Sequence, residues 1–280
     1  MLERMFADLS LAHRLELAEG HACLDFAHTR KRLTPESSTT WDTAHGAIAV
    51  FDGPDSPLTQ TFALGMTSGP GITHSDSYEA RLEALEEFFF SRGAAANHEV
   101  SPLAGLALHQ LLCKRGYQPI EMSSVMYQPA HCPEVPAVVD VRIVKQDEAE
   151  LWGRVGADAW SAEHPEFREF LLDMGRISSN RENTHCFLAI VDGKPAATAV
   201  LHVHGGVALF AGSATLPASR RRGAQSALLN ARMRHACAQG CDLFMMVSEP
   251  GSTSQRNAER NGFRIAYTRT KWQLEPPAVG

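Results

Sequence analysis

The sequence predicts an α/β protein built from two similar halves, each a twisted mixed sheet flanked by helices. Strand-like and helix-like hydrophobic patterns alternate along the whole chain. A proline-rich stretch, residues 129–137, divides the chain near its middle, and the order of helix ends and strands is similar on both sides. With 280 residues, 44% hydrophobic and 21% charged, the chain is long enough for two ordinary globular domains.

The similarity between the two halves rests on two pairs of glycines that end predicted helices. Gly93 precedes Gly240 by 147 residues, and Gly116 precedes Gly262 by 146 residues. Each glycine follows a helical pattern and comes before a strand pattern. Chance agreement of generic helix ends is the alternative to a duplication. We predict a first domain at 1–130, a linker at 131–137 and a second domain at 138–280.

The second half shows its elements most clearly. Asp192-Gly193 and Gly205-Gly206 lie between apolar runs and indicate tight hairpins. The predicted order is β-α-α-β-β-β-α-β-α-β-β. Its elements are a strand at 138–145, helices at 147–160 and 167–174, strands at 185–191, 196–204 and 207–215, a helix to 238, a strand at 243–247, a helix near 252–262, and strands from Phe263.

An arginine-rich turn precedes the helix that ends at 238. It reads Arg220-Arg221-Arg222-Gly223-Ala224-Gln225-Ser226, directly after an apolar strand. A helix start presents unpaired N–H groups and a positive dipole end, so it attracts anions such as a pyrophosphate. The spacing resembles the acyl-CoA pyrophosphate motif of the GNAT superfamily of N-acyltransferases, [Gln/Arg]-x-x-Gly-x-[Gly/Ala], beginning at Arg220. Gln225 takes the last position, where the family has a small residue.

The resemblance covers about residues 138–274 and implies an acetyl-CoA site without a metal. It implies that the strands at 207–216 and 243–247 splay apart to admit the pantetheine arm, which pairs with strand backbone. The helix near 252–262 would flank the cofactor. The cofactor-binding residues so implied are Ala214, Thr215, Leu216, Arg220, Arg221, Arg222, Gly223, Ala224, Gln225, Ser226, Ser254 and Asn257.

The catalytic groups stay unassigned. Where the family often carries its general-acid tyrosine, this chain has Ala258, and Ser254, Asn257 and Tyr267 are possible substitutes. For the base, His202 and His204 share a face of the strand at 196–204. They are either ordinary, partly exposed strand residues or a proton relay, and an ordered water could act instead.

The first half lacks the features of a phosphate loop. Residues 67–76 contain glycines but neither Arg nor Lys, and Asp76 and Glu79 would repel a pyrophosphate. We therefore expect a degenerate first half and one acyl-CoA per chain. Glu83 to Phe90 predicts a helix with an acidic outer face, and Arg30 to Arg32 predicts a solvated loop.

The function favoured by these patterns is transfer of an acetyl group from acetyl-CoA to a primary amine of a small molecule or peptide. The alternative is a non-catalytic acyl-CoA-binding or sensor protein with the same fold. The net charge of −6 argues against a nucleic-acid partner, and no apolar run suggests a membrane partner. Six scattered cysteines without a C-x-x-C pair predict reduced thiols in the cytoplasm, and a homodimer is possible.

Overall fold

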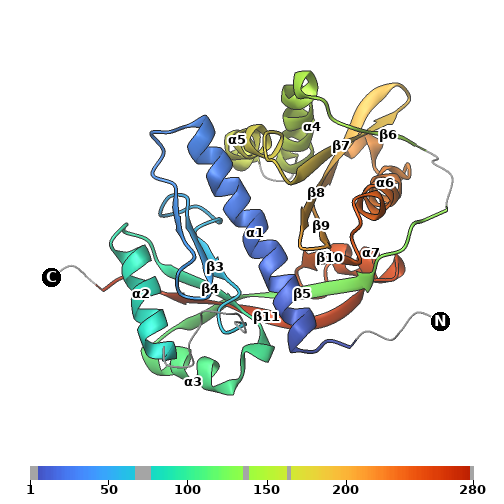
Figure 1. Ribbon diagram of the computed structural model, residues 1–280. Helices are drawn as coiled ribbons and strands as arrows, with labels where there is room; N and C mark the ends of the chain where they lie inside the picture. Colours follow the sequence, from blue (N-terminus) through green and yellow to red (C-terminus); the bar gives the residue numbers. More distant parts are fainter. Residues whose placement is uncertain (1–5, 67–76, 135–138, 163–164, 278–280) are drawn as a thin grey trace. The chain divides into compact units, whose positions relative to one another are not determined.

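The computed structural model describes residues 6–66, 77–134, 139–162 and 165–277 (Figure 1). The chain forms two compact units. Unit 1 comprises Met1–Tyr127 with Val247–Gly280, and unit 2 comprises Gln128–Met246. Within the described ranges, no helix has the length and apolar character needed to cross a membrane.

The described part of unit 1 has its strands in the order β1-β2-β3-β4-β11-β5. All neighbours in this order run antiparallel except β3 and β4. The strands are β1 (Thr40–Asp42), β2 (Ile48–Phe51), β3 (Gln60–Phe62), β4 (Ala96–Val100), β5 (Gln118–Pro129) and β11 (Arg264–Leu274), and the helices are α1 (Leu9–Leu33), α2 (Tyr78–Phe90), α3 (Leu106–Arg115) and α7 (Thr253–Arg260).

The C-terminal strand β11 is built into unit 1. It pairs along one edge with β4 and along the other with β5, so its backbone groups find partners on both sides. The compact units therefore differ from the halves 1–130 and 138–280, which stay a prediction of the repeat. The prediction of two final strands is wrong, because the chain from Arg264 forms a single strand with irregular register.

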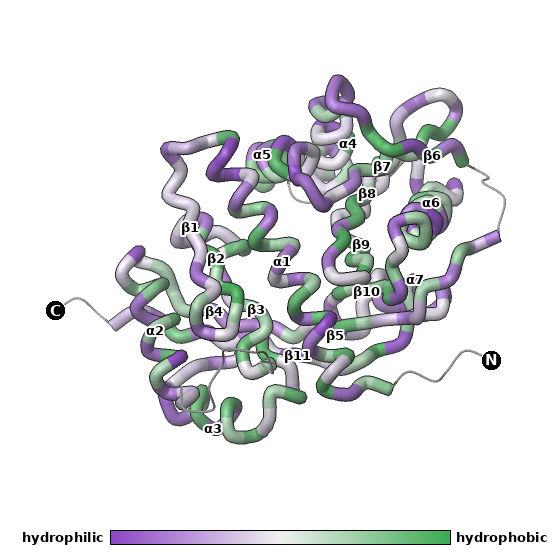
Figure 2. The backbone as a smooth tube through the Cα atoms, in the orientation of Figure 1, coloured by the Kyte–Doolittle hydropathy of each residue, from purple (hydrophilic) through white to green (hydrophobic). Residues whose placement is uncertain are grey.

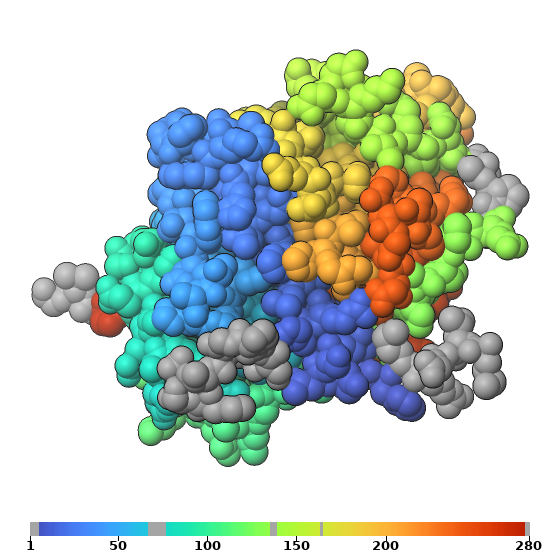
Figure 3. All heavy atoms as spheres, in the orientation of Figure 1, coloured from blue at the N-terminus to red at the C-terminus, as the bar shows by residue number. Residues whose placement is uncertain are grey.

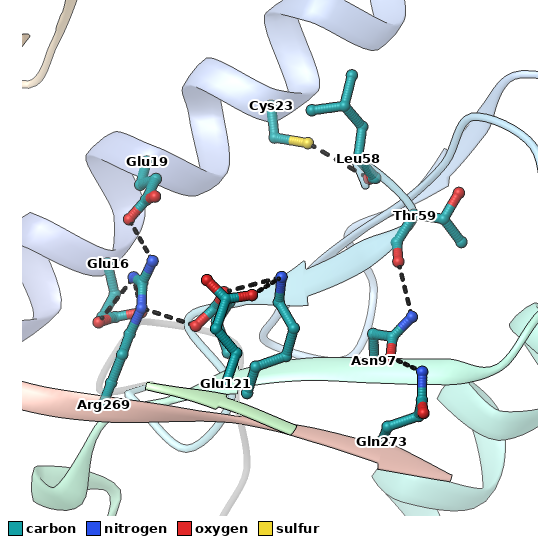
Figure 4. Close-up of polar contacts among 11 residues, drawn as sticks. Glu16, Glu19, Cys23, Leu58, Thr59, Asn97, Glu121, Arg269 and Gln273 are labelled. Atoms are coloured by element: carbon teal, nitrogen blue, oxygen red, sulfur yellow. Dashed lines mark hydrogen bonds and ion pairs between the residues drawn. The ribbon is translucent and has the colours of Figure 1, made fainter. Parts of the chain in front are cut away.

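A charged cluster lies between α1 and the sheet of unit 1 (Figure 4). Arg269 of β11 reaches Glu16 at 3.2 Å, Glu19 at 2.7 Å and Glu99 at 2.9 Å. Tyr267 donates a hydrogen bond of 2.9 Å to Glu16. Burial raises the pKa of Glu16, and burial, partly opposed by Arg269, raises the pKa of Glu19 to about 7. The cluster thus holds ionisable groups away from water.

Two charged segments of unit 1 differ from the sequence prediction. Residues 30–32 form the last turn of α1 rather than a loop, and Arg30 pairs with Asp52 at 2.6 Å. Glu86 is buried rather than on an acidic outer face, because Arg115 donates to it at 2.8 Å and neutralises its charge. The loop at 67–76 lies outside the described residues.

Unit 2 contains the sheet order β10-β9-β8-β7-β6. Helix α4 packs on the face that carries Cys186, while α6 contacts the opposite face through Phe187. These elements follow the predicted order closely. The elements are β6 (Asp140–Ile143), α4 (Ala149–Ser161), α5 (Arg168–Ser178), β7 (Thr184–Val191), β8 (Lys194–His204), β9 (Val207–Thr215), α6 (Ala224–Ala238) and β10 (Leu243–Ser248), of which the last extends two residues beyond the unit.

The core of unit 2 is centred on β8 and β9, which are largely hydrophobic in Figure 2. Leu201 and Leu228 are fully buried between the sheet and α6. Other residues of α6 lie at the surface of the face drawn in Figure 3. Between α4 and α5, Gly175 lies so close to Gly153 that a Cβ added to Gly175 would lie 2.9 Å from the Gly153 Cα. The site described next lies where β9 runs into α6.

Candidate functional site

The parallel strands β9 and β10 pair over only part of their length. The register joins Val207 to Leu243, Ala208 to Phe244, and Leu209 to Met245. Strand β9 then continues through the buried Phe210 to Thr215, and Ala211 and Gly212 on this part of the strand are exposed. Backbone groups on this edge of β9 are therefore available to a ligand that binds like an added strand.

The turn after β9 presents backbone N–H groups to solvent. Arg221 and Gly223 both have left-handed backbone, with φ of +62° and +82°. Gly223 is the N-cap of α6 and has no side chain that could accept a hydrogen bond. The amides of residues 224–226, which have no partner within the helix, are therefore left without a side-chain cap. Successive N–H groups around left-handed residues form a concave anion-binding nest. This arrangement suits a phosphate or pyrophosphate.

Arginine side chains surround the nest. Arg220, Arg221 and Arg222 are all exposed. Arg222 forms an ion pair with Asp192 of the β7–β8 turn, at 2.7 Å, and this contact lowers the pKa of the carboxyl. Asp192 therefore reduces the positive charge that Arg222, one of the predicted cofactor-binding residues, can offer to a bound anion.

The side chain of Gln225 turns toward β9. Its amide donates a 2.6 Å hydrogen bond to the Thr215 hydroxyl. On either side of Thr215, Leu216 donates its backbone N–H to the carbonyl of Ala196 at 2.9 Å, and Ala214 is buried. Gln225 therefore joins the helix start to the end of the strand, which explains how this position accommodates a long side chain.

Ser254 and Asn257 lie on α7 in unit 1, whereas residues 214–226 lie in unit 2. Both side chains are exposed. The Ser252 hydroxyl caps α7 by accepting from the Gln255 N–H at 3.1 Å. The structure thus brings together the predicted strand and loop residues, and the predicted roles of Ser254 and Asn257 stay predictions.

The candidate acid–base residues have different surroundings. The hydroxyl of Tyr267 is engaged with Glu16 in the core of unit 1, and burial raises its pKa well above the ordinary value. His202 is only 2% exposed, so the expectation of a partly exposed residue is wrong for it. Its Nδ1 lies 3.1 Å from the Thr184 hydroxyl. His204 is half-buried, and burial lowers its pKa.

Sequence reasoning missed three features of the site. Strand β9 bulges at Gly212, Arg232 of α6 lies buried behind the bulge, and Asp192 pairs with Arg222. A glycine inside an apolar strand is a signal for a bulge. Arg232 follows Leu228 by four residues and so lies on the buried stripe of its helix. No cluster of three or more potential metal ligands occurs in the described residues.

A mixed sheet whose parallel strands β9 and β10 pair over only part of their length, followed by an arginine-rich helix start, suits a ligand that carries phosphate groups. Residues 134–250 match the family model described as an acetyltransferase (GNAT) domain. Residues 134–250 thus resemble the acetyltransferase domains of the GNAT family, whose members transfer acyl groups from acyl-CoA. A search of curated proteins gives no match.

Solved structures share the fold over most of the chain. A GCN5-related N-acetyltransferase from Kribbella flavida has a TM-score of 0.66 at 19% identity, covering 96% of this chain and 97% of its own. A tandem GNAT protein from the clavulanic acid biosynthesis pathway has a TM-score of 0.58 at 12% identity, covering 84% and 79%. A GNAT-family acetyltransferase from Colwellia psychrerythraea has a TM-score of 0.52 at 15% identity, covering 86% of each chain. At these identities the likeness concerns the fold.

Proposed function

We propose that this protein is an N-acetyltransferase that moves an acetyl group from acetyl-CoA to a primary amine. The observation that carries the proposal is the uncapped start of α6 at Gly223, preceded by left-handed Arg221 and reached directly from the open part of β9. Backbone amides and guanidinium groups at this point suit a pyrophosphate.

The loop and the strand would bind different parts of acetyl-CoA. The amides of residues 222–226 would hold the pyrophosphate, with Arg220 and Arg221 adding charge. Backbone groups of residues 214–216 that are not already bonded to β8 would pair with the pantetheine arm. These contacts orient the thioester along β9, and positioning of this kind supplies much of the rate in a two-substrate reaction.

The reaction forms a carbon–nitrogen bond and breaks a carbon–sulfur bond. The amine loses a proton to become nucleophilic, and the departing thiolate gains one, so protons balance. No Asp or Glu occurs between Lys194 and Thr215, on the strands β8 and β9. We therefore propose that an ordered water, assisted by the half-buried His204, accepts the proton of the amine.

The first half would bind no acyl-CoA, because residues 67–76 lack basic side chains. The excess of acidic over basic residues in 1–130 favours a cationic amine as the acceptor. The acceptor would then be a small polyamine or a peptide amine.

The test is release of free CoA thiol from acetyl-CoA with a panel of primary amines, among them a diamine, a polyamine and a lysine-containing peptide. We expect amine-dependent thiol release and a mass increase of one acetyl group on the acceptor. Gly223→Val, which places a β-branched residue at a φ of +82°, should abolish it. Acetyl-CoA binding without turnover on any amine would favour the non-catalytic acyl-CoA-binding alternative.

A further inference from the structure

Arg232 of α6 is a buried cation bonded to backbone carbonyls. Its side chain is 1% exposed, and burial lowers its pKa to about 9, so it remains charged near neutral pH. Its Nε donates to the carbonyl of Leu228 at 3.3 Å, and its Nη1 donates to the carbonyls of Val200 at 3.0 Å and Ala211 at 3.3 Å. No carboxylate pairs with it among the described residues. The guanidinium also lies over the Phe210 ring, 5.2 Å from the ring centroid. A buried charge balanced only by neutral groups is costly and therefore calls for an explanation.

Two of these carbonyls, those of Val200 and Ala211, lie beside the bulge of β9. The register joins Val200 to Ala211 and Thr198 to Ala214, so two residues of β9 lie opposite the single Ala199 of β8. Gly212 in the bulge has a φ of +56°, and a Cβ there would lie 3.0 Å from the Val200 side chain. Arg232 thus binds carbonyls at the place where the bulge disturbs the ladder.

The geometry of the peptide group determines where the N–H of Gly212 points. In a trans peptide the carbonyl and the following N–H point in opposite directions. Because the Ala211 carbonyl points to Arg232 on α6, the Gly212 N–H points away from α6. Both Ala211 and Gly212 are exposed, on the part of β9 beyond its last pair with β10. A hydrogen bond from a cation to a carbonyl also polarises the peptide and strengthens its N–H as a donor.

We propose that Arg232 is a positioning residue that fixes the β9 bulge and polarises the Ala211–Gly212 peptide, so that the Gly212 N–H binds the carbonyl oxygen of the acyl-CoA thioester. The inference rests on the proposed function, since it needs a thioester along β9. A preorganised donor of this kind stabilises the negative charge that develops on the oxygen during attack by the amine. The positive charge behind it acts without touching the substrate.

The test compares the full-length protein with Arg232→Met and Arg232→Gln. Arg234→Met, two residues along the same helix and half-buried, is the matched control. The direct readout is the infrared carbonyl band of acetyl-CoA labelled with carbon-13 at the carbonyl, bound at saturation. The wild type and the control should shift this band to lower frequency, and both Arg232 variants should shift it less. Their affinity for CoA itself should stay within about twofold of the wild type, because the loop at 220–226 is unchanged.

Once an amine substrate has been found, kcat of both variants should be lower than that of the wild type by about tenfold or more. The decrease should stay smaller than the loss of about 10²–10³-fold that follows removal of an oxyanion donor itself. If Arg232→Met does not fold, Arg232→Gln carries the test, since it keeps a neutral donor and loses the charge. An equal carbonyl shift in wild type and folded variants would overturn the proposal, as would a wild type that binds acetyl-CoA without any shift. Absence of acetyl-CoA binding by the wild type would instead refute the proposed function.

Discussion

Replacement of Arg269 by Met should destabilise unit 1 in a pH-dependent way. The guanidinium is 1% exposed and lies within 3.2 Å of carboxylate oxygens from Glu16, Glu19 and Glu99. Breaking a buried ion pair by removing one partner costs about 3–5 kcal/mol. We therefore expect the free energy of unfolding at pH 8 to fall by about that amount.

The deficit should shrink at lower pH, because a buried carboxylate without its cation can be protonated. Relative to an unfolded pKa near 4.5, neutralising one carboxyl costs about 4.8 kcal/mol at pH 8 and about 1.4 kcal/mol at pH 5.5. Glu19, with a pKa of about 7, is already protonated at pH 5.5 in the wild type. Because the pKa of Glu19 is raised on folding, its protonation favours the folded state. This contribution is fully present below pH 4.5, the pKa of the unfolded chain, and is lost as the pH rises through 7.

The assay is urea unfolding of wild type and Arg269→Met at pH 8 and pH 5.5, with Arg264→Met on the exposed face of the same strand as the control. We expect the deficit at pH 5.5 to be less than half of that at pH 8, and the control to stay within about 0.5 kcal/mol of wild type. The reasoning would be refuted by equal deficits at both pH values, which indicate a packing role, or by a deficit below about 1 kcal/mol at pH 8.

Two further predictions concern packing and domain organisation. Gly175→Ala should lower the unfolding free energy of unit 2 by about 1–3 kcal/mol, because the new Cβ would lie 2.9 Å from the Gly153 Cα. In the control Gly153→Ala, the new Cβ would lie 3.8 Å from Gly175 and should be tolerated. Similar thermal melts of both variants would contradict this prediction. The fragment 137–280 should be poorly soluble on its own, because β11 would lose β4 and β5 and expose both edges; a soluble fragment with full turnover would show the first half to be dispensable.

The local structure of the second half could be predicted from the sequence because its signals are short-range. The hairpin glycines and the apolar alternation place β9 at 207–215, as the structure has it. The start of α6 at Gly223 follows from the loss of apolar pattern in the arginine run. The anion-binding character of this turn rests on backbone N–H groups, which any uncapped helix start presents.

Long-range partners could not be predicted in the same way. Nothing in the residues of β11 indicates that it pairs with β4 and β5 of the other half, since strand propensity does not specify a partner. Arg232 and Glu86 are charged residues whose burial depends on carbonyls or an arginine far away in sequence. Charged side chains are mostly exposed in proteins, so residue type alone places both at the surface.

Calorimetric titration of the full-length protein with acetyl-CoA tests the central claim most directly. We expect one molecule bound per chain. Arg220→Glu should weaken binding by about 1–3 kcal/mol, whereas Arg154→Glu, on α4 at the opposite face of the sheet, should leave it nearly unchanged. Two equivalent sites, or an affinity that does not respond to Arg220→Glu, would contradict a single acyl-CoA site at the start of α6.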